Sequence, residues 1–269
     1  MKRLGAVLGL CLAVVLGGFT FAGEPPSPTL ARIVENQEVR VGMSGNQPPF
    51  TAKGRKGELI GFDVDVANAL AAAMGVKLKL VQKPFAELLS ALEGGEVDLV
   101  LSGMTITPAR SLRFGFAGPY YVSGKSILTK SKELAGHGDV ASFNKEGLTL
   151  VALEGSTSEA FVKNVLSEST LVTAPNYEAA VKMIAKGEAK AMVADLPAVV
   201  VIMARNPDKG LMTPGVLLTT EPIGVAMPSG DLQLEKMVES LLSAMRSTGK
   251  LEERSKYWFQ GVDWLNDLR

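Results

Sequence analysis

The feature that most constrains the fold is an alternation of short apolar strand patterns with amphipathic helix patterns. Residues 39–43 (VRVGM) and 76–81 (VKLKLV) have strand patterns, and residues 61–75 between them have a helix pattern that Gly75 closes. The apolar positions that define the buried face of this helix are Phe62, Val66, Leu70 and Ala73. Strands that alternate with helices are typical of an α/β fold.

A second region repeats this arrangement. Its strand and helix patterns cover residues 148–153, 156–166, 171–174, 176–187 and 188–194. An offset of 92 residues pairs Phe85 with Tyr177, Gly95 with Gly187, Glu96 with Glu188, Ser102 with Ala194 and Gly103 with Asp195. Two unrelated α/β units would also give such weak similarity. We interpret it as two lobes of one design, each with a strand end at an equivalent point.

The N-terminus has the organisation of an export signal. Three residues (MKR) precede an apolar stretch, and Thr20-Phe21-Ala22 resembles a cleavage site for signal peptidase. We therefore expect residues 1–22 to be a signal peptide and the protein to be periplasmic, with an uncleaved membrane anchor as the alternative. The single cysteine, Cys11, lies within this leader, so the mature chain has no disulfide.

The composition of the mature chain excludes several functions. Without Lys2 and Arg3 it has 26 basic and 28 acidic side chains, so nothing indicates a nucleic-acid or membrane-surface partner. One histidine, His137, and no mature cysteine argue against a transition-metal site or a Cys/His nucleophile pair. We expect no cofactor and no metal.

Polar residues gather where the predicted strands end. Residues 102–110 (SGMTITPAR) and 194–197 (ADLP) occupy these positions in the two lobes, and ligands of open α/β sheets bind there. Thr107-Pro108 has the pattern of a helix N-cap followed by a first-turn proline. Arg110 would then lie in the first turn, against the helix dipole, and a carboxylate ligand would explain its presence.

A third segment, residues 153–161 (LEGSTSEAF), contributes a helix start. Ser156 and Glu159 have capping-box spacing, and the free amides near Thr157 favour an anion. Together with Arg110 and Thr105 they would form an anion site, with Asp195 opposite as the acceptor of a cation. This combination matches the zwitterion of an amino acid. Taken singly, Arg110 fits a surface helix residue, Asp195 a turn former and Thr157 a capping residue.

With these motifs the chain resembles a known family, the periplasmic solute-binding proteins that serve ABC importers of polar amino acids (bacterial extracellular solute-binding proteins, family 3). The resemblance covers residues 32–260. It rests on the ordered motifs VRVGMSGNQPPF, GELIGFDVDVANALAAAMG, DLVLSGMTITPAR, GPYY, LEGSTSEAF, VADLP and TGKLEERSKYWF.

The resemblance implies a two-lobed, type II binding-protein fold with two hinge crossings. The crossings would lie near 123–126 and 222–224, so that residues 23–123 and 224–269 form the first lobe and residues 124–223 the second. The residues that would contact the ligand are Arg110 and Thr105 with Thr157 on the α-carboxylate, Asp195, Ser102 and the Gly103 carbonyl on the α-ammonium, and Phe85 as a wall of the side-chain pocket.

Departures from the family pattern concern ligand specificity. Gln47 stands where many relatives have an aromatic residue, and Ser44 stands where binders of basic amino acids often have an acid. We therefore favour a polar ligand that is uncharged or acidic, and we count Gln47 among the ligand-binding residues. Glu154 would reverse this preference if it pointed inward.

The resemblance also defines the rival functions. Relatives include a cyclohexadienyl dehydratase, which needs a general acid in the cleft, and Asp63 and Asp65 are interpreted here as helix-start residues. A sensor ligand-binding domain is a third class, which we expect less than the enzyme because no signalling domain is seen behind DWLNDLR. We expect a monomeric binding protein rather than an enzyme, with a free amino acid and a membrane permease as its partners.

Overall fold

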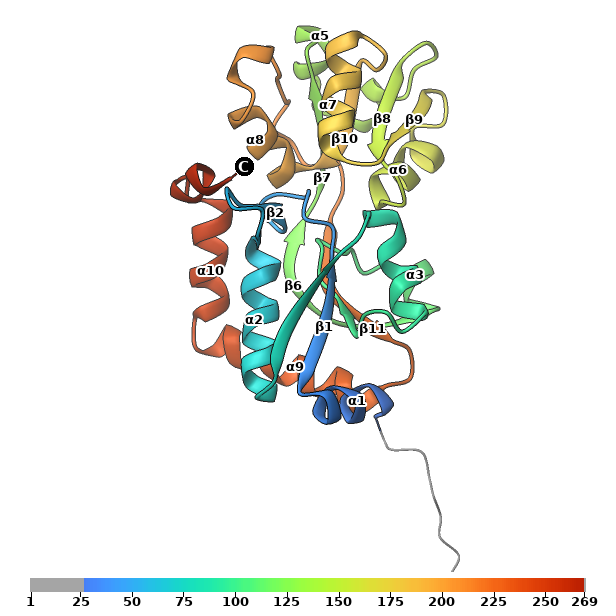
Figure 1. Cartoon of the computed structure of the whole chain (residues 1–269). Helices are drawn as coiled ribbons and strands as arrows, with labels where there is room; N and C mark the ends of the chain where they lie inside the picture. Colours follow the sequence, from blue (N-terminus) through green and yellow to red (C-terminus); the bar gives the residue numbers. More distant parts are fainter. Residues whose placement is uncertain (1–26, 269) are drawn as a thin grey trace, which may run out of the picture.

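The computed structural model describes residues 27–268 and shows two α/β lobes, one above the other in Figure 1. The predicted two-lobed fold is confirmed, whereas the predicted signal peptide lies outside the described residues. Among residues 27–268 no helix has the length and apolarity that a membrane span requires.

The first lobe is built on a five-stranded sheet with the order β4-β1-β5-β11-β6. Strands β4 and β5 run parallel to β1, and β11 runs antiparallel to β5 and β6. The strands are β1 (Glu38–Met43), β4 (Lys77–Gln82), β5 (Leu99–Val100), β6 (Phe114–Ser123) and β11 (Glu221–Pro228), with a separate hairpin of β2 (Ala52–Lys53) and β3 (Leu59–Ile60). Parallel strands β1 and β5 both end at the edge that faces the second lobe.

Helices cover both faces of this sheet. The helices are α1 (Pro28–Asn36), α2 (Phe62–Met74), α3 (Leu88–Glu93, preceded by the 3₁₀ turn Phe85–Glu87), α4 (Pro108–Ser111), α9 (Leu232–Ser247) and α10 (Lys250–Phe259), followed by the 3₁₀ turn Asp263–Asp267. Helices α2 and α10 lie on one side of the sheet and α3 on the other (Figure 1).

One detail of the sequence prediction for the first-lobe helices is wrong. Helix α2 buries Phe62, Val66 and Leu70 as expected, but Ala73 is exposed, because in the last turn Met74 rather than Ala73 packs against the core. In α10, Trp258 is buried, whereas Tyr257 is 39% exposed and lies beside the Arg254 guanidinium. The apolar face of this helix carries Trp258 and Phe259, both of which pack against the first-lobe core.

The second lobe is built on a four-stranded sheet with the order β7-β10-β8-β9, in which β7 is antiparallel to β10 and the others are parallel. Its strands are β7 (Lys125–Thr129), β8 (Thr149–Leu153), β9 (Thr170–Ala174) and β10 (Ala191–Asp195). Its helices are α5 (Lys132–Ala135), α6 (Thr157–Val165), α7 (Tyr177–Lys186) and α8 (Leu196–Ala204), with 3₁₀ turns at Val140–Phe143 and Pro207–Lys209.

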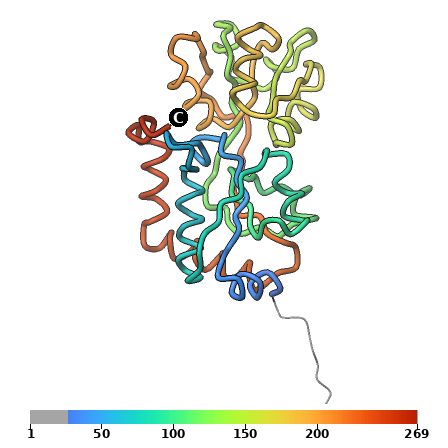
Figure 2. The backbone as a smooth tube through the Cα atoms, viewed as in Figure 1, coloured from blue at the N-terminus to red at the C-terminus, as the bar shows by residue number. Residues whose placement is uncertain are grey.

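Two connections join the lobes (Figure 2). The first runs from β6 to β7 through Gly124, and the second enters β11 at Glu221, which pairs with Ser123. The two segments are bonded to each other, because the Leu218 amide donates to the Lys125 carbonyl at 2.8 Å. A Cβ on Gly124 would lie 2.3 Å from the Thr219 carbonyl oxygen, so the close approach requires glycine there.

The lobes are in contact across the space between them. One cluster of buried apolar side chains includes Phe85 and Leu88 of the first lobe and Tyr177 and Val181 of the second. Phe85 and Tyr177 are the first pair of the 92-residue offset, and each begins a helical segment at this interface. The structure therefore represents a closed arrangement of the lobes.

Candidate functional site

The segment after β5 folds as its sequence predicts. Thr107 is the N-cap of α4, its hydroxyl accepts a hydrogen bond from the Arg110 amide at 3.2 Å, and Pro108 is the first helical residue. The proline has no N–H to leave unpaired, and its fixed φ suits a first turn. This short helix places the Arg110 side chain between the lobes.

The Arg110 guanidinium bridges the two lobes. Its Nη1 donates to the Thr105 carbonyl at 2.9 Å, its Nη2 donates to the Gly155 carbonyl of the second lobe at 3.2 Å, and it lies 5.9 Å from the centre of the Phe85 ring. Burial lowers the pKa of Arg110 to about 10, while the carboxylates of Glu221 and Asp195 oppose this shift. At neutral pH Arg110 is a partly desolvated cation that donates to two neutral acceptors.

Two threonine hydroxyls meet at the same boundary. Thr105 Oγ1 and Thr157 Oγ1 are 3.3 Å apart, and Thr157 is the first residue of α6. Ser156 caps this helix by accepting from the Glu159 amide at 3.2 Å, and Glu159 reaches back to the Gly155 amide at 2.7 Å. The capping interactions keep the start of α6 directed at Arg110 and Thr105.

Ser102 and Gln47, two other predicted ligand residues, are bonded within the first lobe. Ser102 Oγ donates towards Gln47 Oε1 at 2.9 Å and Ser44 Oγ at 2.8 Å, and Ser44 Oγ also contacts Gln47 Oε1 at 3.0 Å. All three side chains are buried. Gln47 also faces Tyr177 of the second lobe and opposes the rise that burial causes in the pKa of the Tyr177 hydroxyl. The network links the first loop to the lobe interface.

Substitution of Gln47 by phenylalanine is expected to change which amino-acid side chain is preferred. It removes the acceptor for two buried hydroxyls and the interaction with Tyr177, and it introduces an aromatic ring into the loop that the sequence predicts to contact the ligand. Dissociation constants for a panel of amino acids, measured by calorimetry, check this, with Gln233→Phe on the exposed side of α9 as the control. A ligand profile identical to the wild type would place Gln47 outside the pocket.

Gly103 and Asp63 form a second buried contact. Gly103 has a φ of +59°, and its amide donates to Asp63 Oδ2 at 2.7 Å, while the Tyr120 hydroxyl donates to Asp63 Oδ1 at 2.9 Å. Burial raises the pKa of Asp63 to about 7, against the opposing effect of these two hydrogen bonds. Asp63 lies in the first turn of α2 as predicted, but it also anchors the loop that carries Ser102 and Thr105.

The raised pKa of Asp63 makes the stability of the folded protein depend on pH. The native group holds its proton up to about pH 7, whereas the unfolded group releases it near the ordinary pKa of 3.8 for an aspartate side chain. The native state therefore binds more protons in this interval, and the Asp63 contribution to stability decreases as pH rises from about 4 to about 7. In urea unfolding, Asp63→Asn should gain stability relative to the wild type over this range. A constant difference between the two proteins would contradict the shifted pKa.

Asp195 has a partner that the sequence analysis missed. The Lys125 ammonium lies 2.9 Å from Asp195 Oδ1 and 3.5 Å from Glu221 Oε2, and its side chain is only 1% exposed. Asp195 ends β10 and makes no side-chain capping bond to α8. The available signal was a lysine at the start of an otherwise apolar strand (KSILT) and a glutamate directly before the apolar run PIGVAM.

A cleft of about 1000 Å³ opens between the two lobes. Its walls come from residues 44–53 and 82–84 of the first lobe and residues 175–182 and 202–209 of the second. Tyr177 lines the cleft, whereas Arg110, Thr105, Thr157 and Asp195 do not. Thr105 and Asp195 are buried, whereas Arg110 and Thr157 are half-buried at the boundary between the lobes. Glu154 is exposed, so nothing in its placement reverses the preference against basic ligands.

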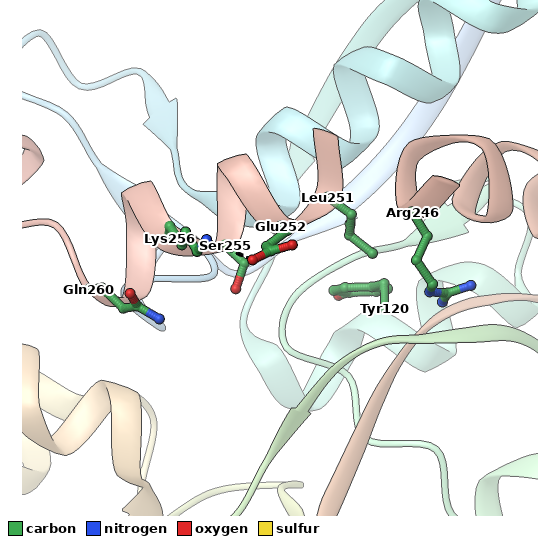
Figure 3. Close-up of a pocket in the computed structure, with 7 residues that line it drawn as sticks. All are labelled: Tyr120, Arg246, Leu251, Glu252, Ser255, Lys256 and Gln260. Carbon is green, nitrogen blue, oxygen red and sulfur yellow. Dashed lines mark ion pairs between the residues drawn. The ribbon is translucent and has the colours of Figure 1, made fainter. Parts of the chain in front are cut away.

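A smaller cavity of about 290 Å³ lies between β6, α9 and α10 (Figure 3). Tyr120 and Arg246 lie at one end of it, and Glu252 and Lys256 form an ion pair of 2.6 Å along α10. None of the predicted ligand residues lines this cavity. Within residues 27–268 no group of three or more His, Cys, Asp or Glu side chains has metal-binding geometry.

Comparison with known proteins identifies the family. The family model of bacterial extracellular solute-binding proteins, family 3, matches residues 39–261. The chain belongs to this family. One family relative is an L-arginine-binding protein of Pseudomonas aeruginosa, 31% identical, with 96% of this chain and 97% of the relative covered.

Two further relatives show the range of the family. A cyclohexadienyl dehydratase of Pseudomonas aeruginosa is 26% identical, with 93% of this chain and 92% of the relative covered. The structure of an ABC transporter binding component from Wolinella succinogenes, complexed with lysine, is 36% identical and has a TM-score of 0.79, with 85% of this chain and 98% of that chain covered. Both a ligand-binding and an enzymatic function therefore exist in proteins similar to this chain.

Proposed function

We propose that the protein is a periplasmic substrate-binding protein that captures a free amino acid between its lobes and delivers it to an ABC importer. The observation that carries this proposal is the position of Arg110. Its guanidinium lies half-buried between the lobes, and the hydrogen bonds that it donates within residues 27–268 go to the two backbone carbonyls of Thr105 and Gly155. A carboxylate would be a stronger acceptor for this fork of donors than a carbonyl.

The two lobes contribute different parts of the proposed site. The α-carboxylate would bind to Arg110 and Thr105 of the first lobe and Thr157 of the second. The α-ammonium would bind to Asp195, with Ser102 and the Gly103 carbonyl, and Phe85 and Gln47 would line the side-chain pocket. A ligand that contacts both lobes favours the closed state, and this difference in affinity drives closure.

We further propose a first lobe of residues 23–123 and 224–269 and a second lobe of residues 124–223. The sheet pairing supports a boundary after Ser123, where β6 ends and β7 begins two residues later. At the return crossing, Glu221 already pairs with Ser123, so the bending segment lies closer to Glu221 than to Gly224. A membrane permease would then bind the closed lobes, and the binding protein would act as a monomer.

A dehydratase is the alternative function, favoured by the relative with that activity. It requires an acid that can protonate a substrate in the cleft. Asp63 has a suitably raised pKa of about 7, but both of its oxygens accept hydrogen bonds from Gly103 and Tyr120, and it is fully buried. Capture without chemistry therefore agrees better with the residues present.

A thermal-shift screen against the twenty amino acids tests the proposed function. The protein should first be unfolded and refolded to remove any ligand that was purified with it. A ligand at one hundred times its dissociation constant stabilises the folded state by about 2.7 kcal/mol, or roughly 5–11 °C for a chain of this size. We expect shifts with one or a few polar, uncharged or acidic amino acids. No shift with any of the twenty, followed by turnover of cyclohexadienyl acids, would establish the enzyme instead.

A further inference from the structure

Lys125 is a buried cation at the point where the chain first enters the second lobe. It begins β7, and its Cα pairs with that of Asp195 across the antiparallel β7–β10 ladder. Residues opposite each other in such a ladder direct their side chains to the same face. The Lys125 ammonium accordingly contacts Asp195 at 2.9 Å, and it also contacts Glu221 of the returning connection at 3.5 Å.

The surrounding groups hold these charges in place. Thr219 Oγ1 donates to Glu221 Oε1 at 2.9 Å and accepts from the Lys125 amide at 3.0 Å. The side chains of Asp195 and Glu221 are only 9% and 11% exposed. Lys125 therefore occupies one side of the carboxylate that is proposed to receive the ligand's α-ammonium.

The charges of this site can be counted. Asp195 and Glu221 contribute two negative charges and Lys125 one positive charge, which leaves one negative charge for an incoming α-ammonium. Arg110 supplies one positive charge for the α-carboxylate, and Glu221 and Asp195 both favour its charged form. An amino acid with a neutral side chain would leave the closed site without net charge, whereas a cationic side chain would add an uncompensated charge. Buried charges without a partner are strongly unfavourable.

We propose that Lys125 is a specificity-determining residue that disfavours amino acids with cationic side chains. This inference rests on the proposed function and extends it to the ligand class.

The open cleft supports the same discrimination independently. Its charged lining residues comprise five basic side chains and one acidic side chain: Lys53, Lys83, Lys182, Arg205, Lys209 and Glu178. Lys83 and Lys182 are ion-paired with Glu96 and Glu178, but the lining keeps an excess of basic groups that a cationic ligand side chain extending into the cleft would face. Like charges repel each other even at the effective dielectric constant of a protein surface.

Lys125→Met tests the inference, because methionine keeps the length and the apolar part of the side chain. The measured quantity is the ratio of the dissociation constants for lysine and glutamine, whose side chains are similar in length and differ by one charge. We expect this ratio to fall by about tenfold or more, which means that lysine binding strengthens relative to glutamine binding. The control is Lys130→Met. Lys130 is exposed and directly follows β7, so this substitution should leave the ratio unchanged.

Glu221→Gln provides a test of opposite sign that does not depend on the folding of the Lys125 variant. It removes a negative charge, so the ratio of the dissociation constants for lysine and glutamine should rise above the wild-type value. The double variant Lys125→Met with Glu221→Gln restores the charge count and should return the ratio close to the wild type. A purely structural role for Lys125 would change both dissociation constants by the same factor.

The possible outcomes separate the two proposals. If the wild type binds amino acids and the ratio is unchanged in both single variants, the role of Lys125 in specificity is wrong and the proposed function stands. If the refolded wild type binds no amino acid, the proposed function itself fails. A wild type that prefers lysine to glutamine would also overturn the inference.

Discussion

Replacement of Arg110 by alanine is expected to weaken amino-acid binding by about 10²- to 10³-fold and to leave the fold intact. Loss of one partner of a buried, hydrogen-bonded charge pair costs binding energy of this order. In the closed structure Arg110 donates to a carbonyl of each lobe and lies beside Phe85. Removal of the guanidinium takes away the proposed carboxylate contact and also one link between the lobes.

Calorimetric titration measures this effect, and circular dichroism verifies the fold. Arg113→Ala is a matched control three residues along the chain, since Arg113 forms an ion pair with Glu93 in which both side chains are more than half exposed (62% and 57%). Exposed ion pairs contribute little to stability, and the control should bind as the wild type does. Equal affinities of Arg110→Ala and the wild type would remove Arg110 from the site.

The largest expected loss of stability follows from Asp98→Ala. The Asp98 side chain is 2% exposed and accepts hydrogen bonds from the Arg32 and Arg40 guanidinium groups and from the Arg40 amide at 2.7 Å. It ties α1 to β1 just before β5 begins. Truncation would leave two partly buried cations and an amide without their shared acceptor, at a cost of about 3–5 kcal/mol.

Urea unfolding of the wild type and Asp98→Ala measures this cost, and ligand affinity at a temperature where both are folded should be unaffected. Glu93→Ala, which breaks only the exposed pair with Arg113, is the control and should change stability by less than about 1 kcal/mol. An Asp98 variant as stable as this control would show that the buried carboxylate is not required.

Local sequence signals predicted much of the fold and part of the site. The Thr107-Pro108 start of α4 and the Ser156 cap of α6 are interactions between residues three positions apart, so their spacing is visible in the sequence. Both interactions aim a helix start at the space between the lobes. The predicted proximity of Arg110, Thr105 and Thr157 is present in the structure for this reason.

Contacts between distant segments were not predictable in the same way. The pairing of Lys125 with Asp195 depends on the register of β7 against β10, which are separated by 70 residues. The hydroxyl network of Ser44, Gln47 and Ser102 similarly depends on how the first loop meets the end of β5. Neither a helical period nor a strand period encodes which polar side chains meet across a sheet edge.

The most direct test of zwitterion capture is calorimetric titration of the refolded wild type with its best amino acid and with two analogues of it. One analogue lacks the α-carboxylate and the other lacks the α-ammonium. We expect one amino acid to bind per chain, and each analogue to bind at least about 100-fold more weakly, because each leaves Arg110 or Asp195 without its charged partner. Affinity that survives the loss of either α-group would contradict recognition of an amino acid by these residues.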